Sequence, residues 1–215
     1  MIKNAYELQP KSGKPQQIVI LLHGVGSNGR DLISLAPYYR QALPDAVFIS
    51  PDAPFAYDMA PPGYEAYQWF SLQERTTEKR LEGVQMVAPI VHAFIDEALK
   101  KYNLPASKLA LVGFSQGTMT SLYVGPRYKE KIAGVLGYSG VLIWEENAKP
   151  ANIIPIHLVH GDMDDVVPVS AYHDAQKRLT ESGFSVTGEI ERGLPHSINE
   201  NGIENGAQFL RQILT

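Results

Sequence analysis

The sequence predicts an α/β fold in which a mostly parallel central sheet carries helices on both faces. Runs such as residues 18–22 and 109–112 are continuously apolar, which is typical of strands buried on both faces. After the first hairpin, such runs alternate with segments of helical periodicity, and this alternation indicates parallel strands joined by crossover helices. The 215 residues, 44% hydrophobic and 20% charged, fit one globular domain spanning residues 1–215.

The individual elements follow from periodicity and from the positions of glycine and proline. We expect strands at residues 5–9, 17–22, 46–50, 109–114, 132–138, 154–160 and 185–191. We expect helices at residues 31–43, 82–102, 116–131, 169–182 and 203–214, with Pro126 disturbing the third. A proline-rich loop at residues 51–63 leads to an aromatic segment at 67–70, and a loop of this length is usually functional.

Charge and cysteine content narrow the class of protein. A net charge of −4 and an isoelectric point near 5.9, without a basic stripe, exclude nucleic acid and an anionic membrane surface as the main partner. The chain has no cysteine, which excludes disulfides and thiolate metal sites and fits a reducing compartment. It shows no signal peptide and no run near the roughly 20 apolar residues of a membrane span. We therefore expect a cytoplasmic protein without stable membrane insertion.

The segment around Ser115 carries the strongest chemical signal. A strand-like run ends in Gly113-Phe114-Ser115-Gln116-Gly117 and a helix-like run follows, which is the context required of a nucleophile on a G-x-S-x-G turn. Side chains at positions 113 and 117 would collide with the neighbouring strand and helix, and the turn strains its central residue. We predict that Ser115 is a nucleophile.

An activated serine needs a histidine as general base and a carboxylate that orients it. When the serine lies on such a turn, the acid and then the histidine follow it in the chain. Asp162, Asp164 and Asp165 qualify as the acid, and chain order leaves the choice open. The histidines that follow are His173, in a predicted surface helix, and His196, in a loop directly after a strand. Because catalytic groups collect at strand ends in such folds, we predict His196 as the base.

The glycine-rich turn at residues 23–29 has two interpretations. Gly24, Gly26 and Gly29 match the dinucleotide-binding fingerprint, with Asp52 about 20 residues further on. The same turn can instead direct an unpaired backbone N–H at a reacting carbonyl oxygen. Dinucleotide binding would leave Ser115, the aspartate cluster at 162–165 and His196 without a role. A dinucleotide-binding oxidoreductase is therefore a remote alternative.

His157, His160 and Asp162 are the candidates for a metal site. Residues 157 and 160 of one strand point to opposite faces of the sheet, so a shared ion is not expected. We interpret both histidines as structural and expect neither a metal nor a cofactor.

Four segments together resemble a known family. HGVGSNG at 23–29, GFSQG at 113–117, GDMDDVVP at 161–168 and GLPHSI at 193–198 are similar to the carboxylesterase, lysophospholipase and acyl-protein thioesterase branch of the α/β-hydrolase superfamily, itself similar to the dienelactone hydrolases. The resemblance covers essentially the whole chain. It implies the α/β-hydrolase fold, and the few inserted residues leave room for little or no lid domain.

The resemblance also implies roles for individual residues. Asp164, the second aspartate of the family's G-D-x-D-x-x-V-P pattern, is implied as the triad acid, and the backbone amides of Val25 and Gln116 as the oxyanion hole. Ser71 replaces the aspartate that the family has after its W-F pair, and Ser139 is interpreted as structural. A homodimer is implied too, although no patch in the sequence demands one.

We therefore expect a serine carboxylesterase that cleaves short- to medium-chain acyl esters or thioesters, with a small-molecule or lipid-like ester as its partner. An acyl-protein thioesterase or lysophospholipase is the alternative, and a peptidase or lipase is a third possibility within the hydrolases. A non-catalytic hydrolase-like binding protein is a remote alternative. The residues expected to bind substrate are apolar and lie in or beside loops of the active face: Trp69, Phe70, Leu142, Trp144, Met163 and Leu194.

Overall fold

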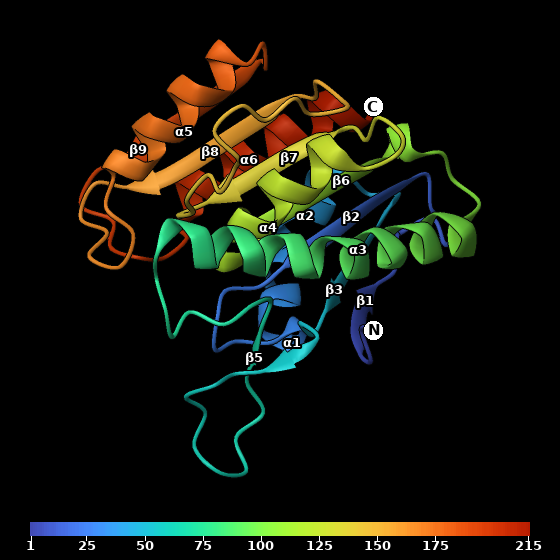
Figure 1. Cartoon of the computed structure of the whole chain (residues 1–215). Coiled ribbons are helices and arrows are strands. Elements are labelled where there is room, and N and C mark those ends of the chain that lie inside the picture. Colours follow the sequence, from blue (N-terminus) through green and yellow to red (C-terminus); the bar gives the residue numbers. More distant parts are fainter.

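A seven-stranded sheet organises the molecule, whose computed structural model describes residues 1–215. The strand order is β1-β3-β2-β6-β7-β8-β9, and all neighbours are parallel except β1, which pairs antiparallel with β3. The strands are β1 (Ala5–Leu8), β2 (Gln17–Leu22), β3 (Ala46–Pro51), β6 (Leu109–Phe114), β7 (Gly134–Tyr138), β8 (Ile156–Gly161) and β9 (Val186–Glu191). The predicted mostly parallel sheet is confirmed (Figure 1).

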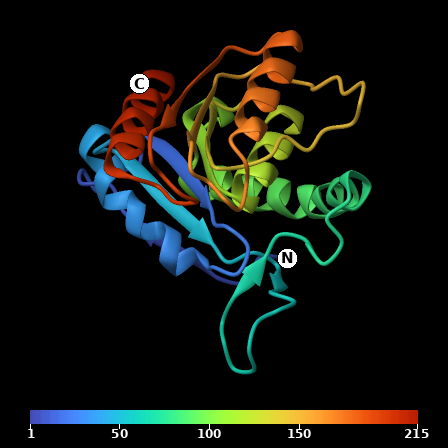
Figure 2. The same cartoon turned by 90° about the vertical axis from the view of Figure 1, so that its left-hand side faces the viewer.

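Helices cover both faces of the sheet, as predicted (Figures 1 and 2). One face carries α3 (Thr77–Tyr102), α4 (Gln116–Val124) and α5 (Ser170–Glu181). The other carries α1 (Gly29–Leu32), α2 (Ala36–Ala42) and α6 (Glu200–Leu214). None of these helices combines the length and the apolar character that crossing a bilayer requires.

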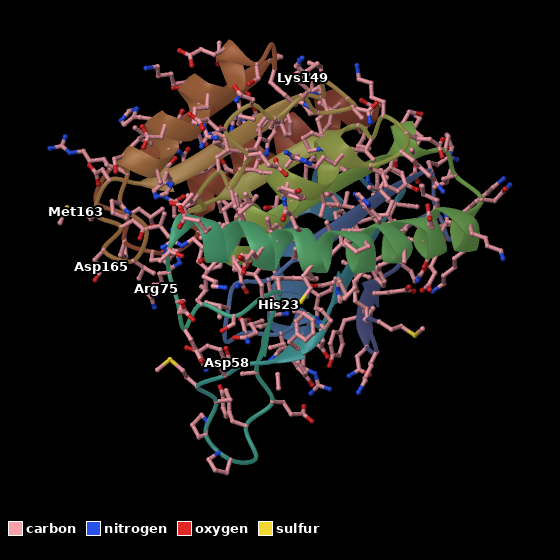
Figure 3. All side chains as sticks on the ribbon, in the orientation of Figure 1. His23, Asp58, Arg75, Lys149, Met163 and Asp165 are labelled. Atoms are coloured by element: carbon pink, nitrogen blue, oxygen red, sulfur yellow. The ribbon has the colours of Figure 1, made fainter.

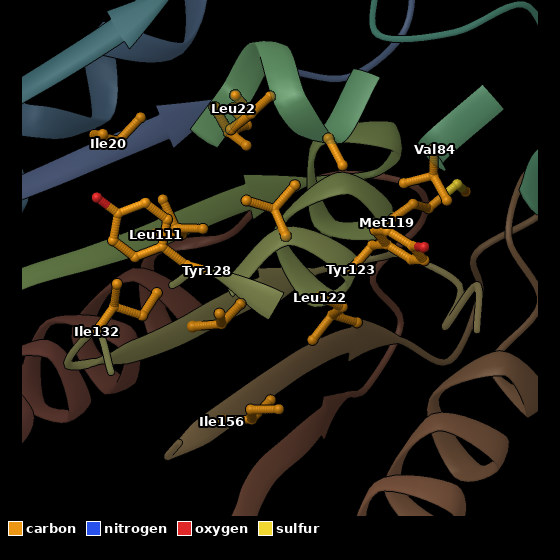
Figure 4. Packing of buried hydrophobic residues seen from close by; sticks show 14 of the residues in the cluster. Ile20, Leu22, Val84, Leu111, Met119, Leu122, Tyr123, Tyr128, Ile132 and Ile156 are labelled. Carbon is orange, nitrogen blue, oxygen red and sulfur yellow. The ribbon is translucent and has the colours of Figure 1, made fainter. Parts of the chain in front are cut away.

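The two faces of the sheet divide the hydrophobic core according to the two-residue period of a strand. In β2, Ile18, Ile20 and Leu22 pack towards α3 and α4, whereas Val19 and Leu21 pack towards α2 and α6. Figure 4 shows the first of these clusters, in which side chains of the sheet meet those of α3 and α4. Full burial of one such side chain contributes about 1.5–3 kcal/mol to the free energy of folding. Because every residue of an unbroken apolar run gains this contribution only when both faces of the strand are covered, such runs specify strands buried on both faces.

Four of the predicted helices differ from the observed ones by more than one residue. Helix α6, expected at 203–214, begins at Glu200, because Asn199 caps it by accepting the Gly202 N–H at 2.8 Å. The helix expected at 31–43 is divided into α1, a 3-10 turn at Ile33–Leu35, and α2. The helix expected at 116–131 ends at Val124, and a 3-10 turn at Gly125–Arg127 follows, because Pro126 has no N–H for the ladder. Helix α3 begins earlier than residue 82, since Thr76 caps it by accepting the Lys79 N–H at 3.2 Å.

Residues 51–70 contain a small hairpin where an irregular loop was expected. Strands β4 (Phe55–Ala56) and β5 (Tyr67–Gln68) pair antiparallel, and the chain between them projects from the body of the molecule (Figure 2). No additional helical layer is inserted over the carboxyl end of the sheet, in agreement with the expectation of little or no lid.

A partly buried ionic cluster fastens the long connection between β7 and β8. Glu145, on this connection, accepts hydrogen bonds from the Tyr123 hydroxyl at 2.8 Å and from Gln85 at 3.1 Å, and it pairs with Arg127 at 2.5 Å. The Arg127 guanidinium in turn lies 3.9 Å from the centre of the Tyr123 ring. These contacts tie the connection to α3 and to the end of α4.

Candidate active site

Ser115 sits on the tight turn between β6 and α4. Its backbone adopts φ 52° and ψ −114°, a conformation that costs a non-glycine residue on the order of 1–3 kcal/mol. The flanking glycines are crowded as predicted: a Cβ at Gly113 would lie 2.4 Å from a backbone nitrogen of α4, and one at Gly117 would lie 1.7 Å from the Leu22 carbonyl oxygen. The Ser115 N–H donates to the Tyr138 carbonyl at 2.9 Å. Sheet pairing therefore holds the strained turn in place.

Asp164 and His196 form a hydrogen-bonded pair at the same edge of the sheet. Nδ1 of His196 donates to Oδ2 of Asp164 at 2.8 Å, and Oδ1 accepts the N–H groups of Val166 and Val167 at 3.0 and 2.8 Å. Burial raises the pKa of Asp164, but these hydrogen bonds, led by that from His196, outweigh it and leave the pKa below its ordinary value. Because an ionised carboxylate only accepts, the proton lies on Nδ1 and Nε2 of His196 is free to act as a base.

The other two aspartates of the cluster lie elsewhere. Oδ1 of Asp162 accepts the Gly193 N–H at 2.6 Å, at the base of the loop that carries His196. Asp165 is exposed and points away from the molecule, as Met163 does (Figure 3). Of the three candidates that chain order left open, the structure brings only Asp164 to His196.

Two contacts that the sequence analysis did not find support the His196 loop. A Cβ at Gly161 would lie 2.1 Å from the Leu194 carbonyl oxygen, so glycine allows the loop to approach β8 closely. Beyond the histidine, the buried carboxylate of Glu191 accepts hydrogen bonds from Asn199 at 2.8 Å and from Asn201 at 2.5 Å. In the sequence, this support appears only as an acid at the end of a strand followed by asparagines. The pattern does not reveal that these side chains meet until the course of the loop is known.

Phe114 brings the serine and the histidine into one small region. Its ring packs on the His196 imidazole with the centroids 4.9 Å apart. Gly24, on the glycine-rich turn, adjoins the same strand end, because a Cβ there would lie 3.2 Å from the Phe114 ring and 3.4 Å from Cβ of Ser115. The candidate nucleophile, the candidate base and the glycine-rich turn therefore meet at the carboxyl edge of the sheet.

The two predicted oxyanion donors lie on the turns that meet here. The Val25 N–H makes no backbone hydrogen bond, although the N–H groups of Gly26 and Ser27 beside it do. Gln116 is the first residue of α4, where a backbone N–H has no acceptor within the helix. Both amides are thus left without a backbone partner.

Asp52 occupies the place that a dinucleotide would need. Its Oδ1 accepts the Gly29 N–H at 2.8 Å, and its Oδ2 accepts from Asn4 at 3.2 Å. The pyrophosphate of a dinucleotide binds at such a helix N-terminus, and the acid of the fingerprint must be free to bind ribose. With its carboxylate buried against α1, Asp52 is used as a structural cap.

The two histidines of β8 lie on opposite faces, as predicted. His157 stacks on Phe209 of α6 with ring centroids 5.2 Å apart, whereas Nε2 of His160 lies 2.8 Å from the Val167 carbonyl oxygen on the other side of the sheet. Nε2 of His160 also lies 3.4 Å from Oδ2 of Asp164, so this histidine lies beneath the loop that carries Asp164. No group of three potential metal-ligating side chains is present.

The residues predicted to bind substrate lie in two different environments. Trp69 and Phe70 have no exposed surface, and Leu142 and Trp144 are each only 6% exposed, so all four belong to the hydrophobic core. The indole of Trp144 donates to the Leu122 carbonyl at 3.0 Å, more than a helical turn along α4 from Ser115. Met163 and Leu194 differ: Met163 is 65% exposed and Leu194 is half-buried, and the Met163 N–H donates to the Leu194 carbonyl at 3.1 Å.

Comparison with known proteins identifies the family. Residues 3–214 match the family model for phospholipases and carboxylesterases. Esterase YpfH of Escherichia coli is 29% identical over 210 residues, covering 96% of this chain and 87% of the relative. Acyl-protein thioesterase 1 of Emericella nidulans is 28% identical over 224 residues, covering 95% of this chain and 93% of the relative. The crystal structure of esterase PE8 matches with a TM-score of 0.91 at 36% identity, and the match covers 98% of both chains. The chain therefore belongs to the phospholipase/carboxylesterase family of α/β-hydrolases, which are hydrolases that act on esters.

Proposed function

We propose that this protein is a serine carboxylesterase in which Ser115, His196 and Asp164 form a catalytic triad. The observation that carries the proposal is the buried Asp164–His196 hydrogen bond beside a serine held in a strained backbone conformation. Strain of this kind persists where function requires it. A binding protein of the same fold would need neither the strain nor the ionised carboxylate beside the imidazole.

The mechanism assigns one step to each group. Nε2 of His196 takes the Ser115 proton as Oγ attacks the acyl carbon, and Asp164 stabilises the imidazolium that results. The carbonyl oxygen becomes an oxyanion, which the Val25 and Gln116 N–H groups bind. His196 then protonates the leaving oxygen or sulfur, which departs, and water repeats the cycle on the acyl-enzyme. Neither a metal nor a cofactor takes part.

Burial around the site supports a short- to medium-chain acyl group. Trp69, Phe70 and Leu142 fill the interior beside the turn, so a long chain would find no open groove among them. The loops that carry Asp164 and His196 have three apolar side chains with exposed surface: Met163, Val166 at 59% exposure, and the half-buried Leu194. We assign these side chains to an apolar part of a small-molecule or lipid-like ester.

Thioester hydrolysis is the second candidate, because several relatives at 25–31% identity are acyl-protein thioesterases. The same triad would serve it, with a thiolate leaving group in place of an alkoxide. Homodimer formation and a cytoplasmic location stay predictions.

Hydrolysis of p-nitrophenyl esters from acetate through butyrate and octanoate to palmitate tests the proposal. Wild type is expected to prefer the shorter chains, and Ser115→Ala to lose at least about three orders of magnitude in turnover while remaining folded. Retained activity in a clean Ser115→Ala preparation would refute the assignment. Labelling by a fluorophosphonate provides an independent readout, since wild type should take up one equivalent and Ser115→Ala none.

A further inference from the structure

The side chain of Gln116 binds a segment that lies outside its own helix. It follows Ser115 in the chain and has no exposed surface. Its Oε1 accepts the Trp69 N–H at 2.9 Å, and its Nε2 donates to the Phe70 carbonyl at 2.7 Å. Both ends of the carboxamide are therefore satisfied by one stretch of backbone, and losing either bond would leave a buried peptide group unpaired.

The segment that Gln116 binds also supports the glycine-rich turn. The Trp69 indole N–H donates to the His23 carbonyl at 2.9 Å. Tyr67 pairs with the turn through its backbone: its carbonyl accepts the Gly26 N–H at 2.8 Å, and its N–H donates to the Ser27 carbonyl at 2.9 Å. Residues 67–70 thus contact both turns that carry a candidate oxyanion donor.

His23 completes the support of the glycine-rich turn (labelled in Figure 3). Its Nε2 accepts the Ala53 N–H at 3.0 Å, so the proton lies on Nδ1, which donates to the Gly24 carbonyl at 2.7 Å. Burial lowers the pKa of this imidazole and keeps it neutral. With both ring nitrogens engaged, His23 holds the backbone and is not a base.

The sheet alone does not fix the two turns relative to each other. Strands β2 and β6 pair in register up to Leu22 and Gly113, and Val25 and Gln116 both lie beyond this last pair. An oxyanion hole requires its donors within about 0.5 Å of the productive geometry. The contacts through residues 67–70 act where strand pairing has ended.

We propose that the Gln116 carboxamide is a positioning residue that sets the spacing of the Val25 and Gln116 N–H groups through residues 67–70. The side chain touches no reacting atom, whereas the backbone N–H of the same residue binds the oxyanion. Loss of the side chain therefore weakens binding of the transition state and leaves ground-state binding of the ester unchanged. This proposal rests on the proposed hydrolysis by Ser115.

Gln116→Met tests it, because methionine keeps the volume and removes both hydrogen bonds. Gln17→Met is the control: Gln17 is a half-buried glutamine at the amino end of β2, whereas the site lies at the carboxyl edge of the sheet, and it takes no part in the 67–70 segment. With p-nitrophenyl butyrate, Gln116→Met should lower kcat about tenfold or more with KM changed less than about twofold. Its inhibition constant for an alkylboronic acid, whose adduct on Ser115 places an oxygen between the donors, should rise by a similar factor. Gln17→Met should leave all three parameters within about twofold of wild type.

Gln116→Glu provides a second readout that does not depend on how well Gln116→Met folds. A protonated carboxyl reproduces the donor and acceptor of the amide, whereas the ionised form cannot donate to the Phe70 carbonyl. The ratio of its kcat to that of wild type should therefore rise as the pH is lowered from about 9 to about 6, because burial raises the pKa of the introduced carboxyl.

The outcomes separate this proposal from the proposed function. If wild type hydrolyses esters and Ser115→Ala does not, the triad stands whatever Gln116 does. In that case, three results each overturn the positioning role: a kcat of Gln116→Met equal to that of Gln17→Met, a loss of activity that appears in KM and not in kcat, or a kcat ratio for Gln116→Glu that does not change with pH. If wild type is inactive or Ser115→Ala is active, it is the proposed function that has failed.

Discussion

Oδ2 of Asp164 accepts from Nδ1 of His196 at 2.8 Å while Oδ1 of the same carboxylate accepts two backbone N–H groups. Both oxygens are therefore committed as acceptors. In Asp164→Asn, one of these positions becomes an NH2 group that faces a donor, whichever way the amide is turned. The imidazole loses its tautomer, and we expect kcat to fall by about 10³–10⁴ with a smaller change in KM. Steady-state kinetics with p-nitrophenyl butyrate measures it.

Asp162→Asn and Asp165→Asn are the controls for this prediction. Asp162 binds the Gly193 N–H through one oxygen, an acceptor that asparagine retains, and Asp165 is exposed. Both variants should keep kcat within about tenfold of wild type. If Asp162→Asn were the most damaging of the three, the role of acid would pass from Asp164 to Asp162.

Replacing Ser115 by glycine should relieve strain that alanine retains. At φ 52° and ψ −114° any side chain is disfavoured, whereas glycine adopts these angles freely. Glycine also gives the unfolded chain more entropy, which offsets part of the gain. We expect Ser115→Gly to be more stable than Ser115→Ala by about 1 kcal/mol. Urea unfolding of the two inactive variants measures the difference, and an equal or lower stability of Ser115→Gly would show that the turn is unstrained.

Gly117→Ala should prevent the native packing of the nucleophile turn. The added Cβ would lie 1.7 Å from the Leu22 carbonyl oxygen, which belongs to a central strand and cannot move aside. We expect a loss of more than about 3 kcal/mol in the free energy of unfolding, seen as a large fall in the thermal midpoint or as insoluble protein. Gly24→Ala is the control, since its Cβ would meet side-chain atoms and no backbone, the Phe114 ring at 3.2 Å and Cβ of Ser115 at 3.4 Å, and should cost less than about 1.5 kcal/mol. Similar losses in both variants would contradict this account.

The Glu145 cluster should stabilise the protein in a pH-dependent way. Burial raises the pKa of Glu145, but hydrogen bonds from its own backbone, Tyr123 and Gln85, together with Arg127, lower it to about 2. A carboxyl group whose pKa is lower in the folded than in the unfolded state stabilises the folded protein. The full contribution is present above the unfolded-state pKa of about 4.3, and it is lost as the pH falls towards 2. At a pH near 7, the wild type should therefore melt at a higher temperature than Glu145→Gln. This difference in melting temperature should disappear between about pH 4.5 and 2.

Calorimetric melting curves across this range measure the difference. Glu146→Gln is the matched control, because Glu146 neighbours Glu145 and is exposed. If the difference in melting temperature between wild type and Glu145→Gln did not change with pH, the ionised form of Glu145 would not be the source of the stabilisation.

The central strands and the nucleophile turn were predictable from the sequence because their signals are local. An unbroken apolar run specifies β2 or β6, and the glycines around Ser115 are required by atoms within a few residues or on the adjacent strand. The start of α3 was placed too late because its first turn is polar and its periodicity begins only once the helix meets the sheet. The β4–β5 hairpin was missed because each strand has two residues and its pairing depends on the glycine-rich turn.

The exposure of the predicted apolar loop residues was less predictable from the sequence than the position of the serine turn. Hydrophobicity and position in a loop describe Trp69 and Met163 equally well, yet the first is fully buried and the second is 65% exposed. What separates them is the partner across the fold: the Trp69 indole has the His23 carbonyl as its acceptor, whereas Met163 has solvent. Such partners are distant in sequence, and nothing in the local pattern identifies them.

The backbone of Ser115 also bears on how the chain has evolved. On stability alone, this conformation favours glycine, and random mutation would in time replace a side chain that the fold does not need. Proteins are kept only somewhat above the stability that they require, so a costly residue persists where natural selection retains it. Under the catalytic role that we propose for Ser115, a serine kept at these angles is a trace of selection for chemistry.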